Sequence, residues 1–342
     1  METYLVLRTD GLGDLILALP VAEAIKDAKP EARVYYAVSP MTSEIASACP
    51  FIDGVIEYDE AAKGPSPVFR LVRAVRRLGP AAAIFLRPTM RTALACLAAG
   101  VPRRVGTSYR YYSFMFNQRC RQHRKFADRH ELEYNLDVLR VLLDVEERRY
   151  TPAIRVPSSA ADFADRVLAE KGLKAKSFVI IHPGSGGSAR NLSLRSYARV
   201  ADLIETDFRT RVLVTAGREE TALIDQMDTY RAARSLTVAD VPRLLDLAAV
   251  IERATLVISG STGPMHLAAA VGTPTVSFFS PVRSCSPRRW GPVGENGTVL
   301  MPPVPECPTC EGRSCDYFDC MSLITEDMIA ETLEPLLKQR PD

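Results

Sequence analysis

The chain has 342 residues, of which 47% are hydrophobic and 25% are charged, and its formal net charge is +2. This length is too great for one ordinary core and fits two domains of common size. The composition is ordinary for a soluble globular enzyme. A net charge so close to zero offers no overall attraction for nucleic acid, so any basic surface must be local.

The N-terminal residues run directly into a strand-like segment, with no basic leader and no cleavage site after an apolar stretch. The longest apolar stretch, 15–24, is interrupted by Pro20 and Glu23 and is too short to span a membrane. We therefore expect a cytoplasmic protein. In that compartment, eight cysteines favour thiols or metal ligands over a disulfide framework.

Short β-branched segments alternate with longer helical patterns, which predicts a parallel α/β architecture. Strands are expected at 4–8, 34–38, 54–58, 82–86, 178–182, 211–215, 256–259 and 275–279. Helices are expected at 67–78, 194–207, 219–230 and 241–253. Prolines near 150–159 break this rhythm and predict a linker. We therefore expect Rossmann-like domains at 1–155 and 156–325, and a helix in 326–342 that packs back on them.

The first candidate for function is the segment 8–14, RTDGLGD, which follows the first strand. Its two glycines allow a tight turn at the carboxyl edge of the sheet, where open α/β sheets bind ligands. It is not a dinucleotide fingerprint, because Ile16 stands where the third glycine should be, and it is not a Walker A loop. Asp14 either faces the crevice or caps the following helix.

The second candidate is the segment 183–190, PGSGGSAR, which follows the strand expected at 178–182. Ser185 and Gly186 would present a hydroxyl and backbone N–H groups to an anion. Arg190 adds a planar guanidinium that suits phosphate oxygens. The alternative is a flexible loop with a solvated arginine.

The third candidate is the segment 261–266, STGPMH, which joins a strand to a helix whose first turn contains Pro264. The N-terminus of that helix would be a second anion site in the same domain. His266 could donate to a phosphate, or it could be a partly buried structural histidine.

Residues 101–130 hold eight lysines and arginines interleaved with aromatic residues. This combination suits an anionic amphipathic ligand at a membrane surface. It suits single-stranded nucleic acid equally, although no RNA-binding motif accompanies it. A solvated loop is the remaining alternative.

Four cysteines, Cys307, Cys310, Cys315 and Cys320, fall within 14 residues near the C-terminus. Four thiols could hold a structural zinc ion, although the spacing is not that of a standard zinc ribbon. Free thiols are the alternative. In either case we expect this cluster to lie away from the three motifs.

Taken in order, Gly13-Asp14, 183–186 and 261–268 resemble the ADP-heptose:lipopolysaccharide heptosyltransferase family. The segment 289–292 and the cysteine-rich tail look similar to it as well. The resemblance implies the GT-B fold, in which two Rossmann-like domains face each other across a cleft. It also implies an inverting transferase that moves heptose from ADP-heptose to an anionic glycolipid of the lipid A/Kdo type. Such an enzyme would work at the cytoplasmic face of the inner membrane.

The resemblance also implies roles for single residues. The aspartate that matches Asp14 is the general base of the family. The C-terminal domain is expected to bind the donor through Ser185, Gly186, Arg190, Glu220, Ser261, Thr262, Gly263, Pro264, Met265 and His266. The resemblance places the acceptor in the N-terminal domain, and there the basic segment 101–130 and the turn before Asp14 indicate Gly13, Arg119, Arg121 and Arg124 as its contacts.

No two aspartates have the spacing Asp-x-Asp, the usual metal-binding pattern of the other large glycosyltransferase fold. Helix N-termini and cationic side chains would then stabilise the leaving diphosphate, and no catalytic cofactor is expected. Two donor-side residues depart from the family pattern. Arg190 stands where the family usually has a lysine, and Ser261 stands where it often has an aspartate. Three rival functions remain. The first is a transferase of the same fold that uses another nucleotide sugar to build O-antigen or envelope glycan. The others are a sugar-nucleotide epimerase and a non-catalytic nucleotide-sugar-binding protein.

Overall fold

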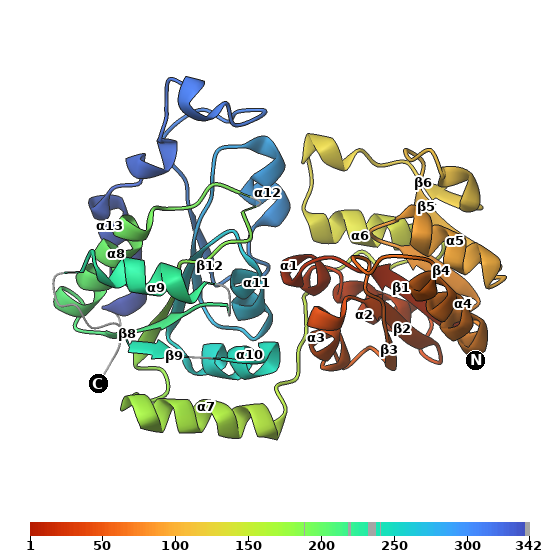
Figure 1. Ribbon diagram of the computed structural model, residues 1–342, viewed down its shortest axis with the longest axis horizontal. Coiled ribbons are helices and arrows are strands. Elements are labelled where there is room, and N and C mark those ends of the chain that lie inside the picture. The colour runs from red at the N-terminus through yellow and green to blue at the C-terminus, as the bar shows by residue number, and fades with distance from the viewer. Residues whose placement is uncertain (188, 218–219, 232–236, 240, 339–342) are drawn as a thin grey trace. The chain divides into compact units, whose positions relative to one another are not determined.

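The computed structural model describes residues 1–187, 189–217, 220–231, 237–239 and 241–338. The chain forms two compact units. Unit 1 comprises Met1–Arg124 and Arg129–Arg155, and unit 2 comprises Lys125–Asp128 and Val156–Asp342. The sequence did not indicate that Lys125–Asp128 would group with unit 2. Each unit contains a parallel sheet with helices, which confirms the predicted α/β fold class (Figure 1).

Unit 1 contains a six-stranded parallel sheet in the order β3-β2-β1-β4-β5-β6. Its strands are β1 (Thr3–Arg8), β2 (Arg33–Val38), β3 (Gly54–Glu57), β4 (Ala82–Phe85), β5 (Arg103–Thr107) and β6 (Gln118–Cys120). The central strand β1 pairs Tyr4 with Val34 on one side and with Ala82 on the other. The apolar run from Tyr4 to Leu7 is fully buried, as expected for a central parallel strand whose two faces are both covered.

The helices of unit 1 cover this sheet. They are α1 (Leu12–Ile16), α2 (Pro20–Ala28), α3 (Ser43–Ser47), α4 (Ser66–Leu78), α5 (Met90–Ala98) and α6 (Glu131–Arg140), with 3₁₀ segments η1 (Pro40–Thr42), η2 (Ser113–Met115) and η3 (Arg124–Phe126). Helix α4 ends at Gly79, whose φ of +60° is a conformation that favours glycine. Helix α5 begins with a capping box in which Thr89 and Thr92 satisfy each other's backbone N–H groups.

The described part of unit 2 contains a second six-stranded parallel sheet, in the order β12-β11-β10-β7-β8-β9. Its strands are β7 (Phe178–His182), β8 (Arg211–Thr215), β9 (Thr237–Ala239), β10 (Leu256–Gly260), β11 (Thr275–Phe278) and β12 (Gly297–Leu300). Its helices are α7 (Ser158–Lys171), α8 (Leu194–Thr206), α9 (Thr221–Asp228), α10 (Leu244–Arg253), α11 (Gly263–Ala270), α12 (Pro287–Trp290) and α13 (Glu326–Leu337), with 3₁₀ segments η4 (Arg283–Cys285), η5 (Gly312–Ser314) and η6 (Cys320–Leu323).

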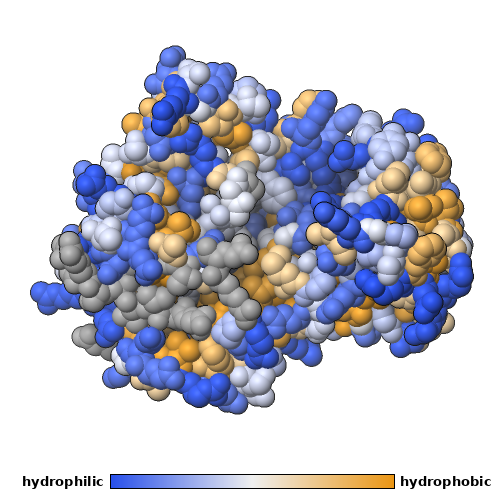
Figure 2. All heavy atoms as spheres, viewed as in Figure 1, coloured by the Kyte–Doolittle hydropathy of each residue, from blue (hydrophilic) through white to orange (hydrophobic). Residues whose placement is uncertain are grey.

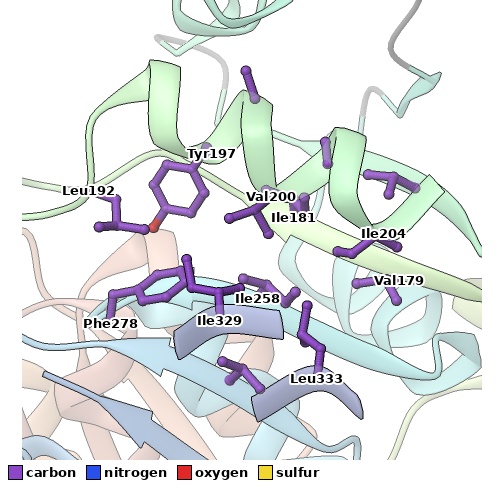
Figure 3. Close-up of a cluster of buried hydrophobic side chains, with 14 of the residues drawn as sticks. Val179, Ile181, Leu192, Tyr197, Val200, Ile204, Ile258, Phe278, Ile329 and Leu333 are labelled. Atoms are coloured by element: carbon purple, nitrogen blue, oxygen red, sulfur yellow. The ribbon is translucent and has the colours of Figure 1, made fainter. Parts of the chain in front are cut away.

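The C-terminal helix α13 belongs to the core of unit 2. Ile329 and Leu333 are buried in the same cluster as Tyr197 of α8 and the strand residues Ile258 and Phe278. Figure 3 shows the side chains of α8 and α13 converging on these strand residues. The rings of Tyr197 and Phe278 meet edge to face, with centroids 5.8 Å apart.

Both sheets have the strand order of a doubly wound fold, with the first strand of each unit at the centre. Strand β1 lies beside β4 in unit 1, and β7 lies beside β10 in unit 2. The strand order reverses at these two pairs, and open α/β sheets bind ligands at the carboxyl ends of such pairs.

No helix in the described residues is both long and apolar enough to cross a membrane.

Candidate functional site

A buried arginine lies at the carboxyl end of β1. Arg8 is 3% exposed, and its Nε lies 2.8 Å from Asp10, its Nη1 lies 3.0 Å from Glu131, and its Nη2 binds Asp14. Its Nη1 also donates to the side-chain oxygen of Asn135 at 3.2 Å. Burial disfavours the charge, but the carboxylates of Asp10, Asp14 and Glu131 raise the pKa of Arg8, so it stays protonated. Arg8 therefore joins β1, α1 and α6.

Asp14 lies in the first turn of α1, where it binds Arg8. Gly11 occupies the N-cap position, and no side chain caps this helix, so the capping interpretation of Asp14 is wrong. The side chain of Asp14 is 30% exposed, against 17% for Asp10 and 1% for Glu131. Of the three carboxylates on Arg8, Asp14 is therefore the most accessible to a bound hydroxyl.

Asp10 is the second carboxylate of this cluster. Burial raises its pKa to about 6, although Arg8 acts in the opposite direction, and the nearby charge of Asp14 adds to the rise. The Nε of Arg87, which follows β4, lies 3.5 Å from Asp10. The pKa of Asp10 therefore lies well above that of an ordinary aspartate.

Sequence reasoning did not assign Arg8, Asp10, Glu131 or Asn135 to the site. Arg8 and Asp10 lie inside the segment that it singled out, and a charged residue at the end of an apolar central strand was the available signal. Glu131 is 123 residues from Arg8, so no local pattern could have indicated their contact.

The structure brings one of the three predicted acceptor arginines to the cluster. The Nη1 of Arg124 lies 2.5 Å from the oxygen of Glu131 that also binds Arg8. Arg119 lies on β6, where its Nε donates to a backbone carbonyl at 3.2 Å, and Arg121 is exposed just beyond that strand. The predicted residue Gly13 immediately precedes Asp14 in α1.

In unit 2, the loop after β7 is fixed to the end of β10 by Asn191. Its Nδ2 donates to the backbone oxygen of Pro183 at 3.1 Å, and its Oδ1 accepts from the hydroxyl of Tyr197 at 2.8 Å. A Cβ atom at Gly260 would lie 2.4 Å from this Oδ1, so a side chain at position 260 would clash. The second and third motifs therefore meet at the carboxyl edge of the sheet, between β7 and β10.

Strand β7 ends in a buried histidine. His182 Nδ1 lies 3.1 Å from the hydroxyl of Thr215, and Nε2 lies 3.7 Å from Glu220. Burial lowers the pKa of His182, against the effect of Glu220, so the ring is neutral. Glu220 also accepts from the N–H of Gly217 at 2.8 Å, and a Cβ atom at Gly184 would lie 2.2 Å from its carboxylate. Glu220, a predicted donor contact, thus lies against the loop after β7.

Ser185 and Gly186 are exposed at the tip of that loop. Ser188 of the same motif and residue 219 of the expected helix 219–230 lie outside the described residues.

Thr262 is the N-cap of α11, and its hydroxyl oxygen is buried without a hydrogen-bond partner among the described residues. The first N–H groups of a helix have no partner within it, so this turn can face an anion.

The remaining residues of the third motif differ in exposure. Ser261, Gly263 and Pro264 are partly exposed, whereas Met265 is 0% and His266 is 4% exposed. The side chain of Met265 therefore packs in the core, and a contact of this residue with a donor would have to come from its backbone.

Arg190, whose side chain is 26% exposed, contacts the cysteine-rich segment. Its Nη2 lies 2.5 Å from Asp319, its Nη1 donates to the sulfur of Cys310 at 3.5 Å, and its guanidinium lies 4.8 Å from the ring centroid of Phe318. The hydrogen bond from Arg190 lowers the pKa of Cys310. The expectation that the cysteines lie away from the motifs is wrong, because the fold joins residues 120 and 129 positions apart.

All eight cysteines are free. In the part of the chain that the structure describes, no group of three or more His, Cys, Asp or Glu side chains is arranged to hold a metal ion. As they lie, Cys307, Cys310, Cys315 and Cys320 do not fit a tetrahedral zinc site. Structural zinc stays a prediction from their spacing.

Solved structures of similar fold cover almost the whole chain. A family 9 glycosyl transferase from Veillonella parvula is 22% identical, with a TM-score of 0.85 over 99% of this chain and 98% of that one. E. coli ADP-heptose lps heptosyltransferase II is 17% identical, with a TM-score of 0.78 over 99% of each chain. E. coli heptosyltransferase WaaC with ADP is 17% identical, with a TM-score of 0.71 over 98% of this chain and 99% of that one. At these identities the likeness establishes the GT-B-like fold.

Sequence comparison extends this from fold to family. The model of glycosyltransferase family 9 (heptosyltransferase) matches residues 68–317. A protein of Haemophilus influenzae, named as a candidate glycosyltransferase, is 31% identical over 302 residues, which are 86% of this chain and 87% of the relative. The chain therefore belongs to glycosyltransferase family 9, the heptosyltransferase family.

Proposed function

We propose that this protein is a metal-independent, inverting glycosyltransferase that moves heptose from ADP-heptose to the lipopolysaccharide inner core. The observation that carries the proposal is the binding of Asp14, a partly exposed carboxylate, to a buried arginine at the carboxyl end of β1. Family membership supports glycosyl transfer as the reaction class. We further propose that the enzyme works on the cytoplasmic face of the inner membrane, where such an acceptor is made.

On the acceptor side, Asp14 takes the proton of the acceptor hydroxyl as its oxygen attacks the anomeric carbon. Attack opposite the leaving diphosphate inverts that carbon, and one base is sufficient for this step. Arg8 acts as a positioning residue, because it binds Asp14 while its other nitrogens are held by Asp10 and Glu131.

On the donor side, the bond from the anomeric carbon to the diphosphate oxygen breaks, and negative charge grows on that oxygen. The N–H groups at the start of α11 and the hydroxyl of Thr262 are suited to stabilise this charge. Arg190 would add a cation after exchanging Asp319 or Cys310 for phosphate oxygens. An adenine donor is supported by the structures of WaaC with ADP and with ADP-2-deoxy-2-fluoro heptose, which share this fold.

A second candidate is a transferase of the same fold that uses another nucleotide sugar for envelope glycan or O-antigen. The observations that favour it are Arg190 and Ser261, which stand where the family usually has lysine and often has aspartate. Both residues are on the proposed donor side, so they bear on the identity of the nucleotide sugar and not on the role of Asp14 as the general base.

A donor panel decides between the two candidates. A ligand that binds only the native state raises the melting temperature, so ADP-, UDP- and GDP-sugars can be compared directly. ADP-heptose should give the largest increase, and it should then label a lipopolysaccharide core acceptor. Stabilisation by a UDP- or GDP-sugar alone would replace the heptose proposal with the second candidate.

A further inference from the structure

Unit 1 contains a long segment without acidic residues. Residues 61–124 hold 13 lysines and arginines and no aspartate or glutamate, whereas the whole chain is nearly balanced, with 43 basic and 41 acidic residues. The segment spans α4, β4, α5, β5 and β6. A local excess of this kind attracts an anionic surface, although the net charge of the protein is close to zero.

Helix α5 has an apolar face that is exposed. Met90, Leu94 and Leu97 are 45%, 45% and 40% exposed, and Ala98 is also exposed. Their spacing of four, seven and eight residues places them on one side of the helix. The opposite side is buried through Thr92, Ala93, Ala95 and Cys96. A helix that is apolar on both sides is normally covered, so this exposed side needs an apolar partner.

Aromatic side chains extend this surface. Tyr111 and Phe114 are 79% and 69% exposed, and the hydroxyl of Tyr111 lies 3.1 Å from the sulfur of Met90. Phe69, on the neighbouring helix α4, is 68% exposed. We define the apolar face as Phe69, Met90, Leu94, Leu97, Tyr111 and Phe114. Figure 2 shows hydrophobic residues gathered on the surface of unit 1 where Figure 1 draws α5.

Arginines border the apolar face. Helix α4 exposes Arg70, Arg73, Arg76 and Arg77. The Nη2 of Arg76 donates to the backbone oxygen of Ala98 at 2.8 Å, so this row of arginines reaches the C-terminal end of α5. Apolar side chains enter the boundary between headgroups and acyl chains, while flanking arginines remain among anionic headgroups.

We propose that the apolar face is the surface through which this protein docks on an anionic lipid bilayer. The inference rests on the proposed function, in which the acceptor is a membrane glycolipid. A second copy of the chain is a poorer occupant. A two-fold contact through this face would bring the arginines of α4 on both copies together, with no carboxylate in residues 61–124 to pair with them.

The test measures flotation of the full-length protein with vesicles. Vesicles of phosphatidylethanolamine and phosphatidylglycerol should bind it, and vesicles of phosphatidylcholine alone should not. Leu94→Gln with Leu97→Gln should lower binding at least about tenfold, because two apolar anchors are lost. Arg70→Gln, Arg73→Gln and Arg77→Gln together should lower it about a hundredfold at low salt, since each basic residue contributes about fivefold.

Matched controls use residues of the same kind elsewhere. Met41→Gln changes a side chain of η1 that is 65% exposed and outside the apolar face. Arg166→Gln, Arg195→Gln and Arg211→Gln change three exposed arginines of unit 2. Both controls should float like the parent. All the changed side chains are exposed, and unaltered melting temperatures will show that the variants fold.

Two results would overturn the inference: a parent that does not float with anionic vesicles, or face variants that float as well as their controls. Loss of self-association in the leucine variant, without a change in flotation, would instead assign the face to a second copy. Transfer to a deacylated, water-soluble acceptor should be unchanged in both face variants. If the parent fails this soluble transfer, the proposed function fails, while flotation still decides the docking surface.

Discussion

Replacement of Arg8 by glutamine tests the charge cluster at the end of β1. The change leaves Asp10, Asp14 and Glu131 without the guanidinium that binds all three. Asp14 can turn to solvent, since it is 30% exposed, but Glu131 is 1% exposed and cannot. The variant therefore leaves buried negative charge with less compensation.

The expected loss of stability follows from this burial. Removing one partner of a buried ion pair costs about 3–5 kcal/mol. Arg124 still lies 2.5 Å from Glu131, which offsets part of the loss, so we expect about 3 kcal/mol, at the low end of that range. Arg148→Gln is the control. Arg148 also lies within ion-pair distance of three carboxylates, at 2.8, 2.5 and 3.8 Å, but it is 36% exposed, so the loss should be at most about 1 kcal/mol.

Hydrogen exchange of the β1 and α6 amides measures the free energy of opening within unit 1. The single tryptophan, Trp290, lies in unit 2, whereas Arg8 and Arg148 are both in unit 1. Its fluorescence should therefore change little in Arg8→Gln and in Arg148→Gln. The loss of stability caused by Arg8→Gln should be larger at pH 8 than at pH 5. Unpaired buried carboxylates have raised pKa values, so the folded state regains stability as they bind protons. A loss no greater than that of Arg148→Gln would refute the proposed energetic role of Arg8.

Three further predictions concern Asp10, Arg190 and metal. Burial raises the pKa of Asp10 from 3.8 to about 6, so its contribution is fully present below pH 3.8 and is lost as pH rises to about 6. The free energy of unfolding of the wild type should fall by up to about 3 kcal/mol over this range, and that of Asp10→Asn should not. Denaturation of both proteins at pH 4 and pH 7 measures this. A difference in stability between the two proteins that is the same at both pH values would contradict the assignment. Arg190→Ala should weaken ADP binding by about 10- to 100-fold in calorimetry and leave adenosine affinity unchanged, because a charged partner of the diphosphate is lost; an equal fall for both ligands would make Arg190 a support of its loop. Activity should persist in excess EDTA, and a loss that Mg²⁺ or Mn²⁺ restores would exclude the metal-independent mechanism.

The central strands could be predicted from the sequence, because they are continuous apolar segments buried on both faces. The strand expected at 178–182 coincides with β7, and that expected at 4–8 differs from β1 by one residue. Strands β5, β6, β9 and β12 were missed. Strand β5 begins with Arg103 and Arg104 and β6 has only three residues, so their pairing in the sheet outweighs local patterns that indicate a basic loop.

The candidate site divides in the same way. The turn that carries Asp14 and the start of α11 are contiguous in sequence, and glycine, proline and polar residues mark both. The contacts that Arg8 makes with Glu131 and Arg190 with Asp319 join residues 123 and 129 positions apart. Only the tertiary structure brings such charges together, and local sequence patterns carry no signal for them.

The most direct test of the central claim is the rate of heptose transfer by Asp14→Asn, measured beside its affinity for ADP. If Asp14 is the general base, kcat should fall by about 10²–10⁴-fold, while ADP affinity and the melting temperature stay close to those of the parent. The asparagine keeps the size of the side chain and an oxygen that can accept from Arg8, so a folding defect is not expected. Turnover close to that of the parent, in a folded variant that still binds ADP, would contradict the assignment of Asp14 as the base.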